Sequence, residues 1–330
     1  MADSTNKSDY VIGIDLGGTK ILSGLFDSAQ GCIGTAKVST KSQRGVDAVI
    51  ERIDRCVRDA VDEADLSLKQ VAAVGIGAPG AVDFGAGTVI FAPNMDGWKD
   101  VALKKELEKH LDLPVFVEND ANIAVLGIHV VELKSKPRNV VGIFVGTGIG
   151  GGLILNGQLY RGANYTAGEI GHMVIDVNGP KCGCGNKGCF EAVASRTAIF
   201  QRIKAGVKAG EKTLLTEMLG TGLDDLRSGD LRKAIRRGDK FAAKVVEEVA
   251  EYIGIGVANL VNILGPDVVV LGGGVIEALA DEMMNVIIKT AKEHAMPGTL
   301  KGVEIVASKL GDSAGITGAA VLARQGNRQS

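Results

Sequence analysis

A histidine and three closely spaced cysteines form the most specific chemical pattern in this sequence. Cys182, Cys184 and Cys189 lie within eight residues, with glycines between them, and His172 comes ten positions before the first cysteine. Three thiolates and one imidazole complete a tetrahedral ligand set for zinc, and short spacings with glycines permit the sharp turns that such a site needs. Four protein ligands leave no open position, so the pattern predicts a structural zinc ion. A reactive thiol pair and a redox switch are the alternatives.

Glycine turns that follow apolar strands are the second candidate for chemistry. Three of them occur, at Gly17-Gly18-Thr19, Gly146-Thr147-Gly148 and Gly272-Gly273-Gly274. Glycine lets successive backbone amides approach an anion closely and form a nest for phosphate. The segment 146–151 formally matches GxGxxG, but a strand is expected after it instead of a helix, which argues against a dinucleotide fold. The turns favour nucleotide phosphates, with ordinary tight hairpins as the alternative.

An aspartate, Asp15, lies at the end of the apolar strand before the first glycine turn. A carboxylate in that position is costly to bury without a partner. A Mg²⁺ ion that bridges nucleotide phosphates would supply the partner, because Mg²⁺ prefers carboxylate and phosphate oxygens. A turn-forming aspartate is the alternative.

Strands and helices alternate along the chain, which predicts an α/β fold. Strands are expected within 10–27, 71–80, 113–120, 139–160 and 267–275, and helices over 45–64, 121–133, 240–264 and about 313–324. The strand–turn units 11–19 and 140–148 can be aligned with each other. This weak internal repeat predicts two related lobes that each present a glycine turn to a shared cleft, and clefts between domains are favoured ligand sites.

The overall composition argues against several classes of protein. The chain has 330 residues, a net charge of −2, a hydrophobic content of 45% and 46 glycines. Such a chain has no global basic field for nucleic acid or an anionic membrane. No apolar run reaches the roughly 18 residues of a membrane span, and the polar tail at 1–10 has no apolar signal core. We expect a cytoplasmic protein of two domains, in which reduced thiols favour metal binding over a disulfide.

Five motifs together resemble the ROK family of sugar kinases. They are DLGGTK (15–20), ENDAN (118–122), GEIGH (168–172), CGCGNKGCFEAVAS (182–195) and VVLGGGV (269–275). The resemblance spans about residues 10–325 and implies an actin-like or hexokinase-like ATPase fold, with two α/β lobes and an active-site cleft between them. It places the smaller lobe at 1–120 plus 313–330 and the larger lobe, with the zinc loop, at 121–312.

The reaction that the resemblance implies is phosphoryl transfer from ATP to the 6-hydroxyl of a hexose, with glucose as the leading acceptor. Other acceptors within the family are N-acetylmannosamine, N-acetylglucosamine, fructose and mannose, and polyphosphate is another donor. The family also includes transcriptional repressors with an N-terminal helix-turn-helix domain, whereas about ten residues precede the first strand here. A non-catalytic sugar sensor is the contrasting expectation. A homodimer or homotetramer is expected, with small-molecule ligands and neither nucleic acid nor membrane as a partner.

The resemblance also assigns individual residues. Asp120 lies where a strand gives way to a helix and matches the catalytic aspartate, and the helix N-terminus is expected to favour its ionised form. The sugar-binding positions are Gly80, Asn94, Asn119, Asp120, Glu169, His172 and Glu191. The ATP- and Mg²⁺-binding positions are Asp15, Gly17, Gly18, Thr19, Lys20, Gly146, Thr147, Gly148, Gly272, Gly273 and Gly274. Ile128 and His129 depart from the family, which often has Glu or another polar residue there, so a nearby surface or subunit contact is expected to differ.

Overall fold

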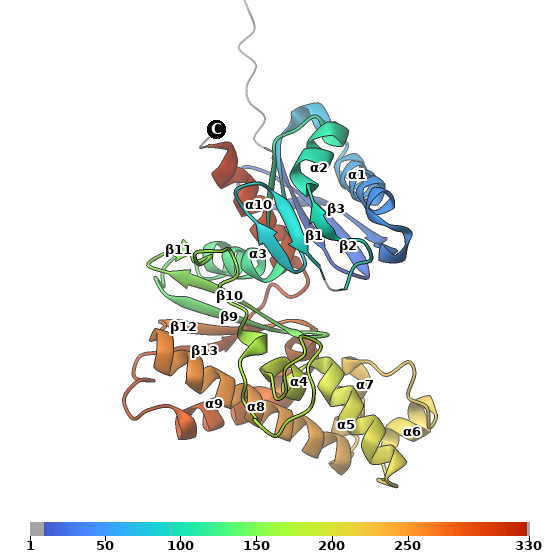
Figure 1. Cartoon of the computed structure of the whole chain (residues 1–330), viewed down its shortest axis with the longest axis vertical. Coiled ribbons are helices and arrows are strands. Elements are labelled where there is room, and N and C mark those ends of the chain that lie inside the picture. Colours follow the sequence, from blue (N-terminus) through green and yellow to red (C-terminus); the bar gives the residue numbers. More distant parts are fainter. Residues whose placement is uncertain (1–9, 93, 329–330) are drawn as a thin grey trace, which may run out of the picture.

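The chain forms two α/β bodies, one above the other in Figure 1. The computed structural model describes residues 10–92 and 94–328. Residues 1–9 of the expected polar tail at 1–10 lie outside the described residues, as do 329–330 at the far end of the predicted smaller lobe. Within the described part of the chain, no helix combines the length and the apolar character needed to cross a bilayer.

The upper body is built on a five-stranded sheet with the order β3-β2-β1-β4-β8. Its strands are β1 (Tyr10–Leu16), β2 (Lys20–Phe26), β3 (Cys32–Ser39), β4 (Val71–Ala78) and β8 (Val115–Asn119). β1 is antiparallel to β2 and parallel to β4, which is in turn parallel to β8. Because parallel strands end at the same edge of a sheet, the ends of β1 and β8 bring Asp15 and Asn119 to one edge.

The lower body repeats this arrangement in a second sheet with the order β11-β10-β9-β12-β13. Its strands are β9 (Val140–Val145), β10 (Ile149–Leu155), β11 (Gln158–Leu159), β12 (Val268–Gly272) and β13 (Glu304–Ala307). β9 is antiparallel to β10 and parallel to β12, as β1 is to β2 and β4. The aligned segments 11–19 and 140–148 are therefore equivalent central strands with their glycine turns, and the predicted repeat is confirmed.

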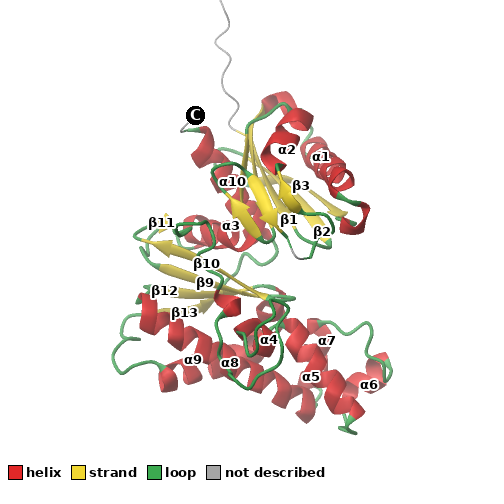
Figure 2. Cartoon of the chain, viewed as in Figure 1, coloured by secondary structure: helices red, strands yellow, loops and turns green. Residues whose placement is uncertain are grey.

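Helices cover the outer faces of both sheets (Figure 2). The upper sheet is covered by α1 (Val46–Asp62) and α2 (Leu103–Leu111), and the lower sheet by α8 (Lys240–Leu264) and α9 (Gly274–His294). The helices α4 (Phe190–Ala194), α5 (Arg196–Lys208), α6 (Leu214–Leu219) and α7 (Ser228–Arg236) extend the lower body. A small sheet of β5 (Ala81–Asp83), β6 (Thr88–Phe91) and β7 (Lys99–Val101) lies beside the upper one.

Helix α3 (Asp120–Gly127) lies between the bodies and packs against α10 (Ser313–Asn327), which covers the upper sheet. Glycine makes this close approach possible. A Cβ atom added to Gly318 would lie 1.6 Å from the carbonyl oxygen of Ile123, and one added to Gly127 would lie 2.6 Å from the backbone nitrogen of Gly318. Asp120, the predicted base, therefore starts a helix that is held against both sheets.

The helix after β8 differs from its prediction. The sequence predicts one helix over 121–133, but α3 gives way at Ile128 to a turn of π-helix, Ile128–Glu132. Long-range contacts favour this change. The Glu132 carboxylate accepts hydrogen bonds from the Ser308 hydroxyl at 2.8 Å and the Lys309 amide at 3.1 Å. Nε2 of His129 lies 2.9 Å from the Pro137 carbonyl oxygen. Ile128 and His129 are both buried within this chain.

Candidate active site

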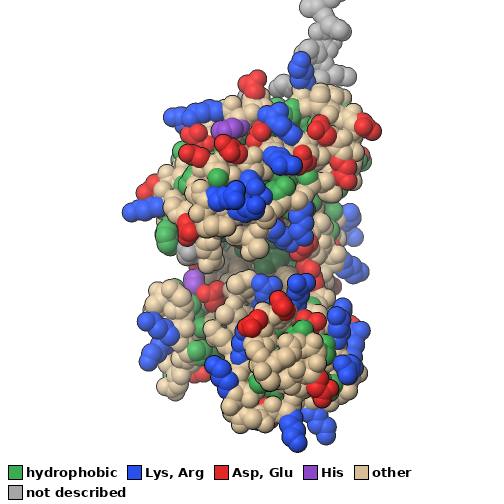
Figure 3. Space-filling view, turned by 90° about the vertical axis from the view of Figure 1, so that its right-hand side faces the viewer, with side chains coloured by type: hydrophobic (Ala, Val, Ile, Leu, Met, Phe, Trp, Pro, Cys, Tyr) green, Lys and Arg blue, Asp and Glu red, His purple; other side chains and the backbone are tan. Residues whose placement is uncertain are grey.

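A cleft between the two bodies brings most of the predicted site residues together. Its cavity has a volume of about 490 Å³, and the space-filling surface in Figure 3 is hollowed at this level. The predicted residues that line it are Asp15, Gly17, Gly18, Lys20, Gly80, Asn94, Asn119, Asp120, Gly146, Thr147, Gly148, Glu169, His172, Glu191, Gly273 and Gly274. Segments that are far apart in the sequence therefore share one cavity.

Two predicted nucleotide-binding residues lie outside this lining. Thr19 is exposed, and its carbonyl oxygen accepts a hydrogen bond of 2.9 Å from the Thr40 amide. Gly272 lines a smaller cavity of about 140 Å³, which adjoins the cleft through the shared residues Phe144 and Glu277. The third glycine turn also leads directly into α9, so it opens a helix and not a second strand.

Asn119 and Asp120 are held in place by the start of α3. Oδ1 of Asn119 accepts hydrogen bonds from the amides of Ala121 and Asn122 at 2.9 and 3.1 Å, as an N-cap does. Its Nδ2 donates to the Gly80 carbonyl oxygen at 3.0 Å, so one N–H of the amide is left for a ligand. Oδ1 of Asp120 accepts from the Ala121 amide at 2.8 Å. This rigid turn leaves the second carboxylate oxygen of Asp120 available for chemistry.

The acidity of Asp120 is opposite to the sequence-based expectation. The helix N-terminus was expected to favour the ionised form, but burial at the cleft raises the pKa of Asp120 from 3.8 to about 7. The negative charge of Asp15 raises this pKa further, and the hydrogen bond from the Ala121 amide opposes the shift only in part. Desolvation and a like charge therefore outweigh the helix terminus. A carboxyl group with a pKa near neutrality is suited to act as a general base.

Acidic residues dominate the side of the cleft next to the first glycine turn. Burial raises the pKa of Asp15 to about 6, Lys20 opposes this shift, and Asp312 adds to it. The pKa of Glu277 is also raised, first by burial and then by Asp312. Lys20 forms an ion pair with Asp312. A Cβ atom on Gly315 would lie 2.9 Å from Cγ of Asp15, so glycine is required there for α10 to start beside this carboxylate.

The second glycine turn carries polar contacts from α4 and α5. The guanidinium of Arg196 donates to the Thr147 hydroxyl, and the Arg196 amide donates to the Gly146 carbonyl oxygen at 2.9 Å. Oε2 of Glu191 accepts a hydrogen bond from the Ile149 amide at 3.2 Å. A Cβ atom on Gly148 would lie 2.2 Å from the same carboxylate oxygen. Contacts from α4 and α5 thus hold the turn from one side. On the side that faces the cleft, Gly146 and Gly148 place no side chain.

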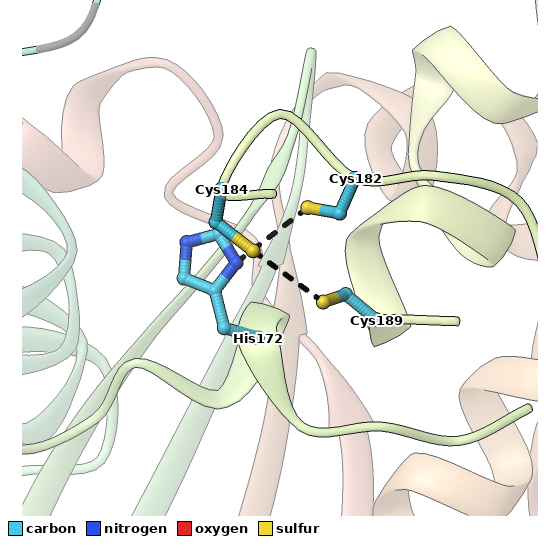
Figure 4. A group of neighbouring side chains, drawn as sticks. All are labelled: His172, Cys182, Cys184 and Cys189. Carbon is cyan, nitrogen blue, oxygen red and sulfur yellow. Dashed lines mark hydrogen bonds between the residues drawn. The ribbon is translucent and has the colours of Figure 1, made fainter. Parts of the chain in front are cut away.

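The histidine and three cysteines form one compact cluster (Figure 4), and His172 also lines the cleft. Their ligand atoms all lie within 4.8 Å of one another. Sγ of Cys184 is 3.6 Å from Sγ of Cys189, and Sγ of Cys182 is 3.8 Å from Nδ1 of His172. Ligands of a tetrahedral zinc ion are about 3.4–3.8 Å apart, given zinc–ligand bonds of about 2.0–2.3 Å. The donor set and its spacing therefore fit zinc.

The sequence analysis missed several residues of the cleft, among them Tyr165, Glu277 and Asp312. A signal was present for two of them. Glu277 follows the third glycine turn within the first turn of α9, and Asp312 stands directly before α10, where acidic residues are favoured. Tyr165 belongs to an irregular segment and gave no such signal.

Comparisons with known proteins agree with this architecture. A glucokinase of Thermotoga maritima is 35% identical over 315 residues, which are 96% of this chain and 97% of that protein. The xylose repressor of Caldicellulosiruptor bescii is 31% identical over 311 residues, which are 93% of this chain and 76% of the repressor. The crystal structure of a ROK family glucokinase from Streptomyces griseus, in complex with glucose and AMPPNP, matches with a TM-score of 0.85 and 34% identity. It covers 96% of this chain and 99% of that one.

The similarity therefore extends over nearly the whole chain, and it confirms the expected fold of two α/β lobes with a cleft between them. The family model described as the ROK family matches residues 11–326. This chain belongs to the ROK family.

Proposed function

We propose that this chain is an ATP-dependent glucokinase, which transfers the γ-phosphoryl group of ATP to the 6-hydroxyl of glucose. The observation that carries the proposal is Asp120, whose carboxyl lines the cleft with a pKa of about 7. The glucokinase of Thermotoga maritima and the Streptomyces griseus enzyme, solved with glucose and AMPPNP, support the choice of substrates. A sugar-sensing repressor needs no general base, and a carboxylate at this position would serve it only as an acceptor of a sugar hydroxyl.

The sugar would bind between Asp120 and the segment that carries Glu169 and His172. All three side chains line the same cavity, and Oε2 of Glu169 lies 3.9 Å from Nε2 of His172. Carboxylates accept hydrogen bonds from sugar hydroxyls, whereas the free N–H of the Asn119 amide donates one. Asp120 would take the proton of the 6-hydroxyl as that oxygen attacks phosphorus. General-base assistance of this kind contributes typically about 10²–10⁴-fold to the rate.

The phosphates of ATP would lie on the glycine turns at 17–18, 146–148 and 273–274. The backbone amides of these turns stabilise negative charge and position the phosphates. Because phosphoryl transfer has a loose transition state, such stabilisation and positioning supply most of the catalysis. The adjoining carboxyl groups of Asp15, Glu277 and Asp312 have one lysine, Lys20, beside them. This excess of acid beside a phosphate site fits Mg²⁺. The ion would neutralise phosphate charge and would be held chiefly by Asp15.

Zinc would occupy the cluster of His172, Cys182, Cys184 and Cys189 as a structural ion. Nδ1 of His172 faces the thiols, so its Nε2 is left on the side of Glu169 and the cleft. A metal bond at Nδ1 would keep the proton on Nε2 and make this nitrogen a donor to a sugar hydroxyl. The ion would therefore hold the sugar-binding segment in shape without taking part in the reaction.

Replacement of Asp120 tests the proposal. Asp120→Asn keeps the shape of the side chain and removes the base, so kcat for glucose should fall by at least about 10²-fold. Glucose should still bind to the variant in calorimetry. Near-normal turnover by Asp120→Asn would exclude this residue as the base.

A panel of hexoses assayed with ATP and with polyphosphate, reporting kcat/KM for each, tests the choice of acceptor and donor. We also propose a cytoplasmic homodimer or homotetramer, to be checked by light scattering.

A further inference from the structure

A buried carboxylate of the upper body is paired with an arginine of the lower body. The carboxylate lies next to the turn that carries Asn119 and Asp120, which we call the catalytic turn. Glu118, the residue before Asn119 in β8, has a side chain that is 2% exposed. Its Oε2 accepts a hydrogen bond of 2.6 Å from Nε of Arg161, which follows β11 of the lower sheet. The guanidinium also lies over the ring of Phe84, 3.8 Å from its centre, in the turn after β5. We call Glu118, Arg161 and Phe84 the clasp.

The other oxygen of Glu118 is committed to the catalytic turn itself. Oε1 accepts a hydrogen bond from the Asn119 amide at 2.9 Å and another from Nδ2 of Asn122 at 3.0 Å. These two residues flank Asp120 in the sequence. One carboxylate therefore joins the backbone of the catalytic turn to Arg161.

The segment after Arg161 leads to the predicted sugar-binding residues. The Arg161 carbonyl oxygen accepts a hydrogen bond of 3.1 Å from the Ala167 amide, which folds the segment 161–167 into a compact loop directly before Glu169. Within this loop Tyr165 lines the cleft and has a positive φ of 61°. Its hydroxyl lies 3.4 Å from the position that a Cβ atom on Gly85 would take, next to Phe84. The loop thus meets the turn after β5 at two points.

We propose that Arg161 is a positioning residue for sugar phosphorylation, and that the clasp sets the distance between Asp120 on one side and Glu169 on the other. This inference rests on the proposed function. Arg161 does not need to touch the sugar. It acts because its rigid, planar guanidinium bonds to Glu118 and stacks on Phe84 at the same time, which a lysine cannot reproduce.

A merely structural role is the competing explanation, and one pair of variants separates the two. Arg161→Met removes the cation and leaves the buried charge of Glu118 without an ion-pair partner, which destabilises a protein strongly. Glu118→Gln combined with Arg161→Met removes both charges and keeps an oxygen that can accept from Asn119 and Asn122. The double variant should therefore recover most of the thermal stability, but the loop before Glu169 would still have lost its anchor.

The test measures kcat and KM for glucose and for ATP, together with the melting temperature. In Arg161→Met and in the double variant, kcat/KM for glucose should fall by about 10²-fold, as misplacement of reacting groups by about 1 Å produces. Because misplacement of the base slows the chemical step, the fall should appear in kcat as well as in KM for glucose, with KM for ATP changed by less than about threefold. Arg161→Lys should recover part of the loss, because it restores the charge but not the stacking.

Arg202 provides a matched control. It pairs with Glu248 at 3.7 Å and lies 5.2 Å from the ring centre of Tyr252, on the lower body and outside the cleft lining. Arg202→Met should leave the glucose kinetics unchanged within about twofold, since such half-exposed pairs contribute little.

A double variant that regains the wild-type kcat/KM for glucose together with its melting temperature would overturn the positioning role. So would an Arg161→Met protein with the kcat/KM for glucose of the wild type. A wild-type enzyme that does not phosphorylate glucose would instead refute the proposed function, and the kinetic role of the clasp with it.

Discussion

The raised pKa of Asp120 makes the pH dependence of the reaction the sharpest test of the cleft. With a pKa of about 7, this carboxyl is ionised in about one molecule of eleven at pH 6 and in about ten of eleven at pH 8. The base must be ionised to accept a proton, so kcat/KM for glucose should rise about tenfold between these two pH values. A carboxylate governed by the helix N-terminus alone would be fully ionised across this range.

The assay follows glucose 6-phosphate formation from pH 5.5 to 8.5 at ATP and Mg²⁺ concentrations well below those that saturate the enzyme, so that the profile reports the free enzyme. Asp120→Asn is the control that should lose the inflection. A second arm uses Asp15→Asn and measures glucose binding to the metal-free protein by calorimetry. The negative charge of Asp15 contributes to the raised pKa of Asp120, so its removal should move the titration to lower pH. A flat wild-type profile over this range, or an inflection that persists in Asp120→Asn, would refute the reasoning.

The same shifts fix the sign of the stability profile of the ligand-free protein. The pKa values of Asp15 and Asp120 are both raised in the folded state from 3.8, to about 6 and about 7. Between pH 3.8 and the raised pKa values of about 6 and about 7, the folded state therefore binds more protons than the unfolded chain. Their contribution to stability is fully present below about pH 4 and is lost as the pH rises towards 7. Asp120→Asn should flatten the upper part of this profile.

Three further tests, one of them with a control variant, address other parts of the structure. Cys184→Ser should lose about one zinc ion per chain, measured by metal analysis, and raise KM for glucose far more than KM for ATP. A wild type that purifies without zinc would contradict this. Gly318→Ala should destabilise by at least about 2 kcal/mol in chemical denaturation, since its Cβ would meet the Ile123 carbonyl oxygen at 1.6 Å. The control Gly229→Ala adds a Cβ atom with no neighbour within 4 Å, so it should change stability by less than about 1 kcal/mol. Saturating glucose should close the cleft and reduce the radius of gyration in solution scattering, and an unchanged radius would contradict closure.

The elements that could be predicted from the sequence are those whose signals are local. The helix expected over 240–264 has these limits because Asp239 caps its start through a 2.9 Å hydrogen bond from the Ala242 amide, and Gly265 ends it in a left-handed conformation. The repeat of a strand and a glycine turn was visible for a similar reason. Each copy is short and contiguous, and the sheet order that follows from it is common to both bodies.

The features that could not be predicted depend on partners far away in the chain. The π-helical turn at Ile128–Glu132 is fixed by Ser308 and Lys309, more than 170 positions later. In the sequence, nothing distinguishes Glu118 from an ordinary acid at the end of a strand, because only the fold places Arg161 against it. The acidity of Asp120 was misjudged because the helix N-terminus is a local feature, whereas desolvation and the charge of Asp15 arise only when the cleft is assembled.

Glu191 explains how a structural metal could influence sugar binding more than nucleotide binding. Its Oε1 lies 3.4 Å from Sγ of Cys182, and its Oε2 accepts from the Ile149 amide in the strand after the second glycine turn. Metal loss would release His172 directly, because this ring is itself part of the cluster. The glycine turn would feel the loss less directly, through this carboxylate, while Arg196 continues to hold Thr147. The two effects should therefore differ in size but have the same sign, with a small rise in KM for ATP accompanying a large rise in KM for glucose.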